Sequence, residues 1–315
     1  MSRYLVTGGA GFIGSNIVKE LVSRGEKVTV IDDLSTGNIA NITPYLDQIE
    51  FVEGSITNLD LLKKLLKDVD YVLHQAAIPS VARSVEDPIR SNEANVTGTL
   101  TLLTAVRDAK IKSFVYASSS SVYGNTKQLP KNEDMNPQPL SPYAVSKLTG
   151  EYYVRVFASL YNINAISLRY FNVFGPHQNP QSQYAAVIPK FITGMLRGER
   201  PVIYGDGEQS RDFTFIDNVV HANILAATKL QNGAGRIMNI ACGARYTLNT
   251  LVEYLNEILN TELSPEHTES APGDVKHSQA DISRAREYVG YTPQVSLKDG
   301  LEKTALWYKE YKGNE

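Results

Sequence analysis

Short apolar runs alternate with amphipathic stretches along the first 170 residues of the chain. Residues 12–25 have helical spacing, because Ile13, Ile17 and Leu21 share one face and Gly25 ends the stretch. Further helices are expected over 59–68 and 96–109, and nearly all-apolar strands over 3–8, 27–32, 49–54, 70–76, 112–118 and 162–170. This rhythm predicts an α/β fold with a parallel sheet covered on both faces.

The rhythm breaks after residue 170. The pattern there predicts a loop over 169–191, a helix over 219–230, a strand over 236–241, a helix over 247–259 and a loop over 264–274. We therefore expect a doubly wound, Rossmann-type parallel sheet in residues 1–170, which 212–236 rejoins, and a smaller α/β domain in 171–315. The two domains are interleaved along the sequence.

Composition and charge narrow the choice of partners. The chain has 315 residues, 42% of them hydrophobic, and a net charge of −3. This balance favours neither nucleic acid nor a membrane surface, and no apolar run approaches the length of a membrane span. The start of the chain lacks the pattern of a signal peptide, and a single cysteine, Cys242, fits a reducing cytoplasm. The five histidines are scattered, so we predict no metal site.

A glycine-rich loop, TGGAGFIG, connects the first expected strand to the first expected helix. Glycines at this point allow a tight turn and let the backbone approach a pyrophosphate, which the helix N-terminus also attracts. Asp32 ends the second strand eighteen positions after Gly14 and can accept both ribose hydroxyls, which favours NAD over NADP. The alternative to a dinucleotide-binding loop is an ordinary glycine turn. The neighbouring Asp33 is interpreted as a residue that starts a turn.

A tyrosine and a lysine share one helix face, and a serine run ends the fifth strand. SPYAVSK places Tyr143 and Lys147 four residues apart behind Pro142. Such a pair alone is most often solvated surface. Serines 118–121 follow directly on an apolar strand, so they are better explained by the carboxyl edge of a sheet than by a flexible linker.

Together these features resemble the extended branch of the short-chain dehydrogenase/reductase superfamily, over essentially the whole chain. The resemblance implies that Tyr143 is the base, that Lys147 lowers its pKa, and that Ser119 assists at the sugar oxygen, with Ser118 structural. It also implies NAD as cofactor, held by Gly8, Gly11, Phe12, Ile13, Asp32, Ser35, Thr36, Gly37, Ser55, Ile56, Gln75, Ala76, Ala77, Asn95, Tyr143, Lys147 and Val173.

The later motifs resemble the UDP-sugar 4-epimerase family. RYFNVFG, AAVIPKF, VIYGDG and SRDF follow in the family's order, and SSSVYG lacks the acidic pair of 4,6-dehydratases, which disfavours dehydration. The smaller domain is then expected to bind the UDP-sugar. The contacts implied are Ser84, Ser120, Ser121, Asn172, Ala186, Val187, Phe191, Val202, Tyr204, Arg211, Asp274 and Ser278.

Three positions depart from the family pattern. Ala271 replaces an arginine that would contact phosphate, for which Lys276 or Arg245 is a possible substitute, while Ser55 replaces a common aspartate and Pro79 a lysine. Ser278 is small where related UDP-galactose 4-epimerases carry a tyrosine, and it leaves room for an N-acetyl group. The resemblance therefore favours UDP-N-acetylglucosamine and UDP-N-acetylgalactosamine as substrates, with UDP-glucose and UDP-galactose also open.

Two alternatives stay open at this stage. A uronate 4-epimerase or decarboxylase would need an extra basic residue near the sugar, for which Arg83 is a candidate. A non-catalytic NAD-binding sensor would need the glycine loop but not Ser119, Tyr143 and Lys147 together. The resemblance also implies a homodimer, formed through 100–109 and the helix that carries Tyr143.

Overall fold

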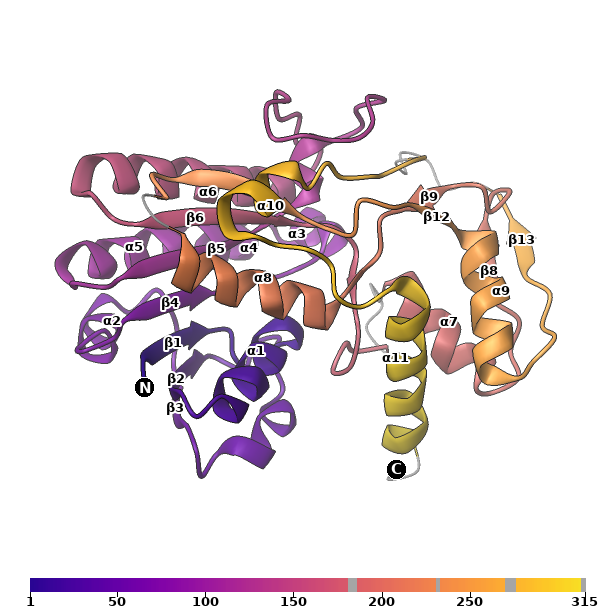
Figure 1. The fold of residues 1–315 in the computed structure, drawn as a ribbon, viewed down its shortest axis with the longest axis horizontal. Coiled ribbons are helices and arrows are strands. Elements are labelled where there is room, and N and C mark those ends of the chain that lie inside the picture. Colours follow the sequence, from indigo (N-terminus) through magenta and orange to yellow (C-terminus); the bar gives the residue numbers. More distant parts are fainter. Residues whose placement is uncertain (181–185, 231–232, 270–275, 313–315) are drawn as a thin grey trace.

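A parallel sheet of seven strands forms the centre of the molecule in the computed structural model, which describes residues 1–180, 186–230, 233–269 and 276–312 (Figure 1). Across the sheet the strands run β3 (Glu50–Glu53), β2 (Lys27–Asp32), β1 (Arg3–Thr7), β4 (Tyr71–His74), β5 (Ser113–Ser119), β6 (Ala165–Tyr170) and β11 (Arg236–Ile240). The order reverses between β1 and β4, so the predicted doubly wound fold is confirmed.

Helices cover both faces of this sheet because successive strand residues point to opposite sides. Tyr4 and Val6 pack in one core with α1 (Phe12–Ser23) and α8 (Ile216–Lys229), whereas Leu5 packs in the other core. That second core is closed by α2 (Leu59–Leu65), α5 (Gly98–Asp108) and α6 (Pro142–Tyr161). The expected helices over 12–25, 59–68, 96–109 and 219–230 are all present.

The seventh strand comes from late in the chain. β11 pairs in parallel with β6, from Arg236 beside Ile166 to Ile240 beside Tyr170. The sequence pattern placed this strand in the tail, whereas the structure places it in the central sheet, directly after α8. The segment that rejoins the sheet thus extends beyond residue 236. The domain boundaries themselves stay a prediction.

Most of the remaining helices and strands lie toward the carboxyl ends of the central strands (Figure 1). They are α3 (Val81–Glu86), α4 (Pro88–Asn92), β7 (Val173–Phe174), α7 (Val187–Met195), β8 (Val202–Tyr204), β9 (Ser210–Arg211), β10 (Thr214–Phe215), β12 (Tyr246–Thr247), α9 (Leu248–Leu259), β13 (Glu266–Thr268), α10 (Ser283–Val289) and α11 (Leu297–Lys312). The expected loops over 169–191 and 264–274 were wrong in part, because they contain β7, α7 and β13.

Two further properties concern the whole of the described chain. None of the described helices combines the length and the apolar character that a membrane crossing requires. Within the same residues, no group of three His, Cys, Asp or Glu side chains is placed to hold a metal ion. The absence of a metal site in the protein stays a prediction.

Candidate active site

The glycine loop is packed so tightly that side chains are excluded. Gly8 has a φ of +69°, and a Cβ atom there would lie 2.6 Å from the backbone nitrogen of Ala76. A Cβ atom at Gly14 would lie 2.0 Å from the carbonyl oxygen of Gly8. Helix α1 begins at Phe12, so its first N–H groups face this loop. The cradle fits a pyrophosphate that approaches the backbone directly.

Asp32 lies beside that cradle at the end of β2. Its two carboxylate oxygens accept hydrogen bonds from the backbone N–H groups of Ala10 and Leu34, both at 2.9 Å. Burial raises the pKa of Asp32, and these two hydrogen bonds lower it. A Cβ atom at Gly37 would come within 2.8 Å of the carboxylate, so the loop that follows β2 packs closely on it. This arrangement fits an adenosine ribose.

The other predicted cofactor residues line the same edge. Asn95 accepts a hydrogen bond from Ile78 N at 2.7 Å and donates to Ile78 O, so its side chain shapes the loop after β4. Gln75 donates to the Tyr170 hydroxyl and to Asn223. The remaining predicted contacts lie around them: Ser35 and Thr36 exposed after β2, Ser55 and Ile56 after β3, Ala76 and Ala77 after β4, Ile13 in α1 and Val173 in β7.

The serine run leaves β5 at the carboxyl edge, as predicted. The hydroxyl oxygen of Ser119 accepts a hydrogen bond from Ser121 N at 3.2 Å, and a short 3-10 turn follows over Ser120–Tyr123. Ser118 is buried and donates to Glu151 of α6 at 2.5 Å, which confirms its structural role. Ser119 is left facing the start of α6.

Helix α6 brings its two predicted catalytic side chains to this turn. The helix begins at Pro142, and Ser141 caps it by accepting a hydrogen bond from Ala144 N. The Lys147 ammonium nitrogen lies 5.9 Å from the centre of the Tyr143 ring and donates to Ala117 O at 2.9 Å. The Ser119 hydroxyl is close enough to Tyr143 to lower the pKa of that tyrosine. The three residues therefore meet at one point.

Burial works against the predicted effect of Lys147 on Tyr143, which stays a prediction. Burial raises the pKa of Tyr143 to about 12, against the lowering effect of the Ser119 hydroxyl. Burial also lowers the pKa of Lys147 to about 8. In this site burial disfavours both charged forms, so the protein groups do not by themselves produce a low tyrosine pKa. The contribution of a positive nicotinamide stays a prediction.

Three predicted sugar-nucleotide residues are brought together by backbone pairing. Asn172 donates from its side chain to Asp212 O at 3.1 Å, next to Arg211. Ser278 N donates to Ser210 O at 2.9 Å, so Ser278 lies alongside β9. Asn172, Arg211 and Ser278 therefore form one wall. Asp274 and Ala271 lie outside the described residues.

The other predicted substrate residues are more dispersed. Ser84 is fully buried, and its hydroxyl accepts from Tyr143 N at 2.9 Å and donates to Val81 O. Its observed contact is thus with the backbone of the catalytic helix, and contact with sugar stays a prediction. Ala186 precedes α7, Val187 and Phe191 lie in α7, and the exposed Val202 and Tyr204 lie in β8.

Sequence reasoning missed Asp212. This buried carboxylate accepts backbone hydrogen bonds from Cys242, Gly243 and Ala280, at 2.9 to 3.1 Å. It thereby fastens the end of β11 and the segment after Ser278 to the strand that carries Arg211. Burial raises its pKa to about 7. The aspartate just before the two phenylalanines of SRDFTF was the available signal.

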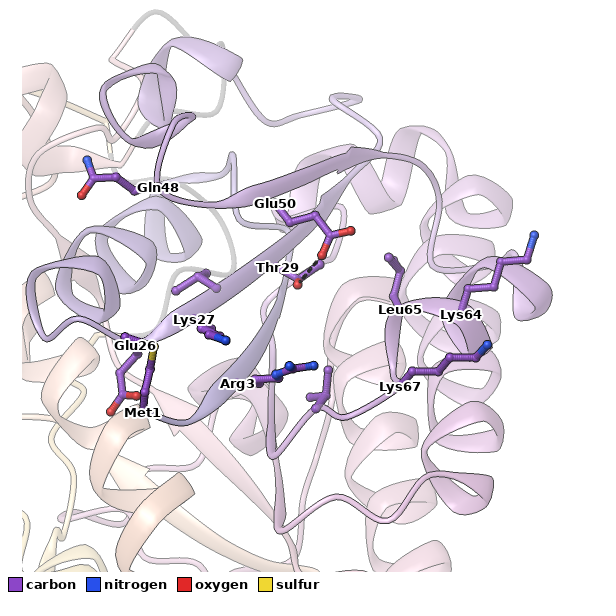
Figure 2. Close-up of a pocket in the computed structure, with 12 residues that line it drawn as sticks. Met1, Arg3, Glu26, Lys27, Thr29, Gln48, Glu50, Lys64, Leu65 and Lys67 are labelled. Atoms are coloured by element: carbon purple, nitrogen blue, oxygen red, sulfur yellow. Dashed lines mark hydrogen bonds between the residues drawn. The ribbon is translucent and has the colours of Figure 1, made fainter.

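A separate pocket lies at the opposite edge of the sheet. This hollow of about 450 Å³ lies at the amino ends of β1, β2 and β3. Figure 2 shows Arg3, Lys27 and Lys67 among the side chains that line it. Ligands of doubly wound folds bind at the carboxyl ends of the strands. This pocket is therefore not part of the candidate site.

Fold and site together define an enzyme of the dinucleotide-binding Rossmann type. A sequence profile of the NAD dependent epimerase/dehydratase family matches residues 4–241. A relative described as a putative UDP-glucose 4-epimerase, from Methanocaldococcus jannaschii, is 39% identical over 97% of this chain and 98% of its own length. The UDP-glucose 4-epimerase of Mycolicibacterium smegmatis is 37% identical, over 98% of both chains. The chain therefore belongs to the NAD dependent epimerase/dehydratase family.

Solved structures agree over nearly the full length. The UDP-N-acetylglucosamine 4-epimerase of Methanobrevibacter ruminantium M1, in complex with UDP-N-acetylmuramic acid, has a TM-score of 0.94 and 42% identity, covering 98% of this chain and 99% of that one. The UDP-glucuronic acid 4-epimerase of Bacillus cereus, in complex with UDP-glucuronic acid and NAD, has a TM-score of 0.90, 36% identity and the same coverage. The predicted superfamily, enzyme class and cofactor are confirmed at the level of the family.

Proposed function

We propose that the protein is an NAD-dependent 4-epimerase of UDP-N-acetylhexosamines, with UDP-glucose and UDP-galactose as further substrates. The meeting of Ser119, Tyr143 and Lys147 beside the glycine loop supports the reaction. The small, buried Ser278 on the wall shared with Arg211 supports the N-acetyl preference. The name of the Methanobrevibacter structure is consistent with that choice.

The chain's own groups hold and move the proton. Gly8 and Asp32 would hold NAD, which would supply the acceptor and donor of the hydride for C4 of the sugar. Tyr143 takes the proton of the C4 hydroxyl, and Ser119 donates a hydrogen bond to the carbonyl oxygen that forms. Once the 4-keto sugar has rotated so that the hydride would return to the opposite face of C4, Tyr143 returns the proton to the C4 oxygen. Proton and hydride both go back to the sugar, so the reaction has no net redox change.

A uronate-acting enzyme is the second candidate. Arg83 is half-buried in α3, next to Ser84, whose hydroxyl touches the backbone of Tyr143. A guanidinium at this place suits a sugar carboxylate. Two proteins similar to this chain are named for uronate substrates. They are the UDP-glucuronic acid 4-epimerase of Bacillus cereus and a UDP-N-acetyl-alpha-D-glucosaminuronate decarboxylase of Bacillus cytotoxicus, which is 31% identical.

We also propose that the enzyme acts as a homodimer in the cytoplasm. Apolar side chains of α6 and α4 are exposed on one side of the molecule, including Val156, Leu160 and Ile89. A second copy of the chain would cover them.

Product analysis tests the proposed reaction. The purified protein is incubated separately with UDP-N-acetylglucosamine, UDP-glucose and UDP-glucuronic acid, and the products are resolved by NMR. We expect C4 epimers, formed faster from UDP-N-acetylglucosamine than from UDP-glucose. Conversion of UDP-glucose alone would contradict the N-acetyl preference inferred from Ser278. A product from UDP-glucuronic acid alone would favour the uronate-acting enzyme. Full turnover by a Tyr143→Phe variant that retains NAD would contradict the mechanism.

A further inference from the structure

Three cationic side chains are buried in the described part of the chain: Lys131, Lys147 and Arg169. Arg169 pairs with Glu151 at 2.7 Å, and Lys147 belongs to the catalytic group. Lys131 has no role so far. Its ammonium makes one long hydrogen bond, 3.4 Å to Gly124 O, and among the described residues no carboxylate lies within ion-pair distance of it. A buried ammonium with three donors and one weak acceptor is costly.

The backbone of Lys131 runs beside the wall that contains Ser278. Lys131 N donates to Gln279 O, and Asp281 N donates to Lys131 O, both at 2.8 Å. From this position the side chain reaches Gly124, at the far end of the serine turn. Lys131 therefore links the two segments that are predicted to contact the sugar, with its backbone on the Ser278 segment and its ammonium at the end of the serine turn.

Lys131 and Lys147 occupy equivalent positions around that turn. Lys147 donates to Ala117 O just before the turn, and Lys131 donates to Gly124 O just after it. The two side chains are 4% and 2% exposed, so Lys131 is about as buried as the predicted catalytic lysine. Between them, the hydroxyl of Ser121 is buried and has no hydrogen-bond partner among the described groups. Among the described residues, the Ser121 hydroxyl thus lacks a hydrogen-bond partner, and the Lys131 ammonium has only the distant Gly124 O and the face of the Tyr123 ring, 5.9 Å from its centre.

The electrostatic surroundings of Lys131 are positive. Burial lowers its pKa, and the charge of Arg211 lowers it further. An acceptor oxygen from a ligand would counter both effects, because it favours the charged form.

We propose that Lys131 is a substrate-binding residue that donates a hydrogen bond to an acyl carbonyl or carboxylate oxygen on the sugar, and so selects which substituents the pocket accepts. This inference deepens the proposed function and rests on it for the presence of a UDP-sugar in this pocket. A sugar contact follows from the position between Ser278 and the serine turn.

Binding measurements on the NAD-containing enzyme test the assignment. Dissociation constants are determined by calorimetry for UDP, UDP-glucose, UDP-N-acetylglucosamine and UDP-glucuronic acid, with wild type and Lys131→Met. We expect the variant to bind the two sugars with carbonyl or carboxylate groups about ten- to a hundredfold more weakly, with UDP unchanged and UDP-glucose less affected. The assignment would be overturned if UDP lost as much affinity as the two sugar nucleotides with carbonyl or carboxylate groups. It would also be overturned if no ligand lost affinity.

Matched variants separate binding from damage to the fold. Lys127→Met removes an exposed lysine of the same loop and should leave all four constants unchanged. Lys131→Gln keeps a donor at similar reach; it should lose less affinity than Lys131→Met, and an equal loss would count against a hydrogen bond. NAD content is measured in each variant. Calorimetry reports binding whether or not the enzyme is active. A wild type that is inactive but shows this selectivity would therefore contradict the proposed reaction and leave the role of Lys131 intact.

Discussion

Lys147 supplies a positive charge near the Tyr143 ring. Its ammonium nitrogen lies 5.9 Å from the tyrosine ring, and its pKa of about 8 makes it positive at neutral pH. The base form of Tyr143 is negative, so this charge favours it, whereas burial opposes it.

We therefore expect Lys147→Met to move the acid limb of the kcat–pH profile to higher pH, by on the order of one pH unit. Rates rise with pH because the base must be deprotonated, and losing the positive charge raises the pKa of that base. The profile is measured between pH 6 and 10 with UDP-N-acetylglucosamine, beside Lys127→Met as control. An unshifted limb would mean that Lys147 acts through binding alone.

Residue types and spacing were enough to predict side chains that the structure brings close together. The i,i+4 spacing of Tyr143 and Lys147 needed only a helix, and Ser119 needed only the end of a strand. Their pKa values were not predictable, because burial depends on chain segments far away in the sequence. The hydrogen bond between Ser84 and the backbone N–H of Tyr143 could not be predicted either, because the two residues lie far apart in the sequence.

At the scale of elements, α6 is fastened to the sheet by Glu151. This buried carboxylate lies one turn after Lys147, accepts two hydrogen bonds from Arg169 of β6 at 2.8 and 2.7 Å, and accepts a third from Ser118 of β5. It thus ties the helix that carries Tyr143 to the strand that ends in Ser119. The charges are paired almost completely away from water.

Glu151→Gln should lower the free energy of unfolding by about 3–5 kcal/mol, because it leaves the Arg169 charge buried without its partner. Urea denaturation followed by circular dichroism measures the change. Glu20→Gln breaks the exposed pair of Glu20 with Arg24 on α1 and should cost less than about 1 kcal/mol. Equal losses for the two variants would show that burial of the Glu151 pair has no special effect.

Long elements were predictable from hydrophobic period, and short ones were not. The period needs several residues to appear, so strands of two or three residues such as β7 and β13 left no pattern. The strand character of β11 was visible, but its neighbour was not, because its parallel partner β6 lies far back in the sequence.

At the scale of the whole molecule, α6 presents apolar side chains away from the sheet. Val145, Tyr152, Val156 and Leu160 follow helical spacing and are all exposed, and Ile89 of the adjoining α4 is 81% exposed. A stripe of this kind on a globular protein favours contact with another protein surface.

We expect the wild type to elute as a dimer and Val156→Glu as a monomer, since a charge within the stripe would have to be buried without a partner. Size-exclusion chromatography with light scattering measures the mass. Leu306→Glu, which replaces an exposed leucine of α11, should stay dimeric. If the wild type is a monomer, or if the Val156→Glu variant is still a dimer, this face of α6 is not the dimer interface.

The position of β11 has a consequence for how the protein is made. During synthesis, β6 leaves the ribosome long before its outer neighbour, and the chain must first produce the segment up to α8. Until residue 240 has emerged, the nascent sheet ends in a newly made apolar strand with one unpaired side, a template for mispairing. A stop or a long pause within this interval would expose that strand to other chains, so translation speed here bears on the yield of folded enzyme.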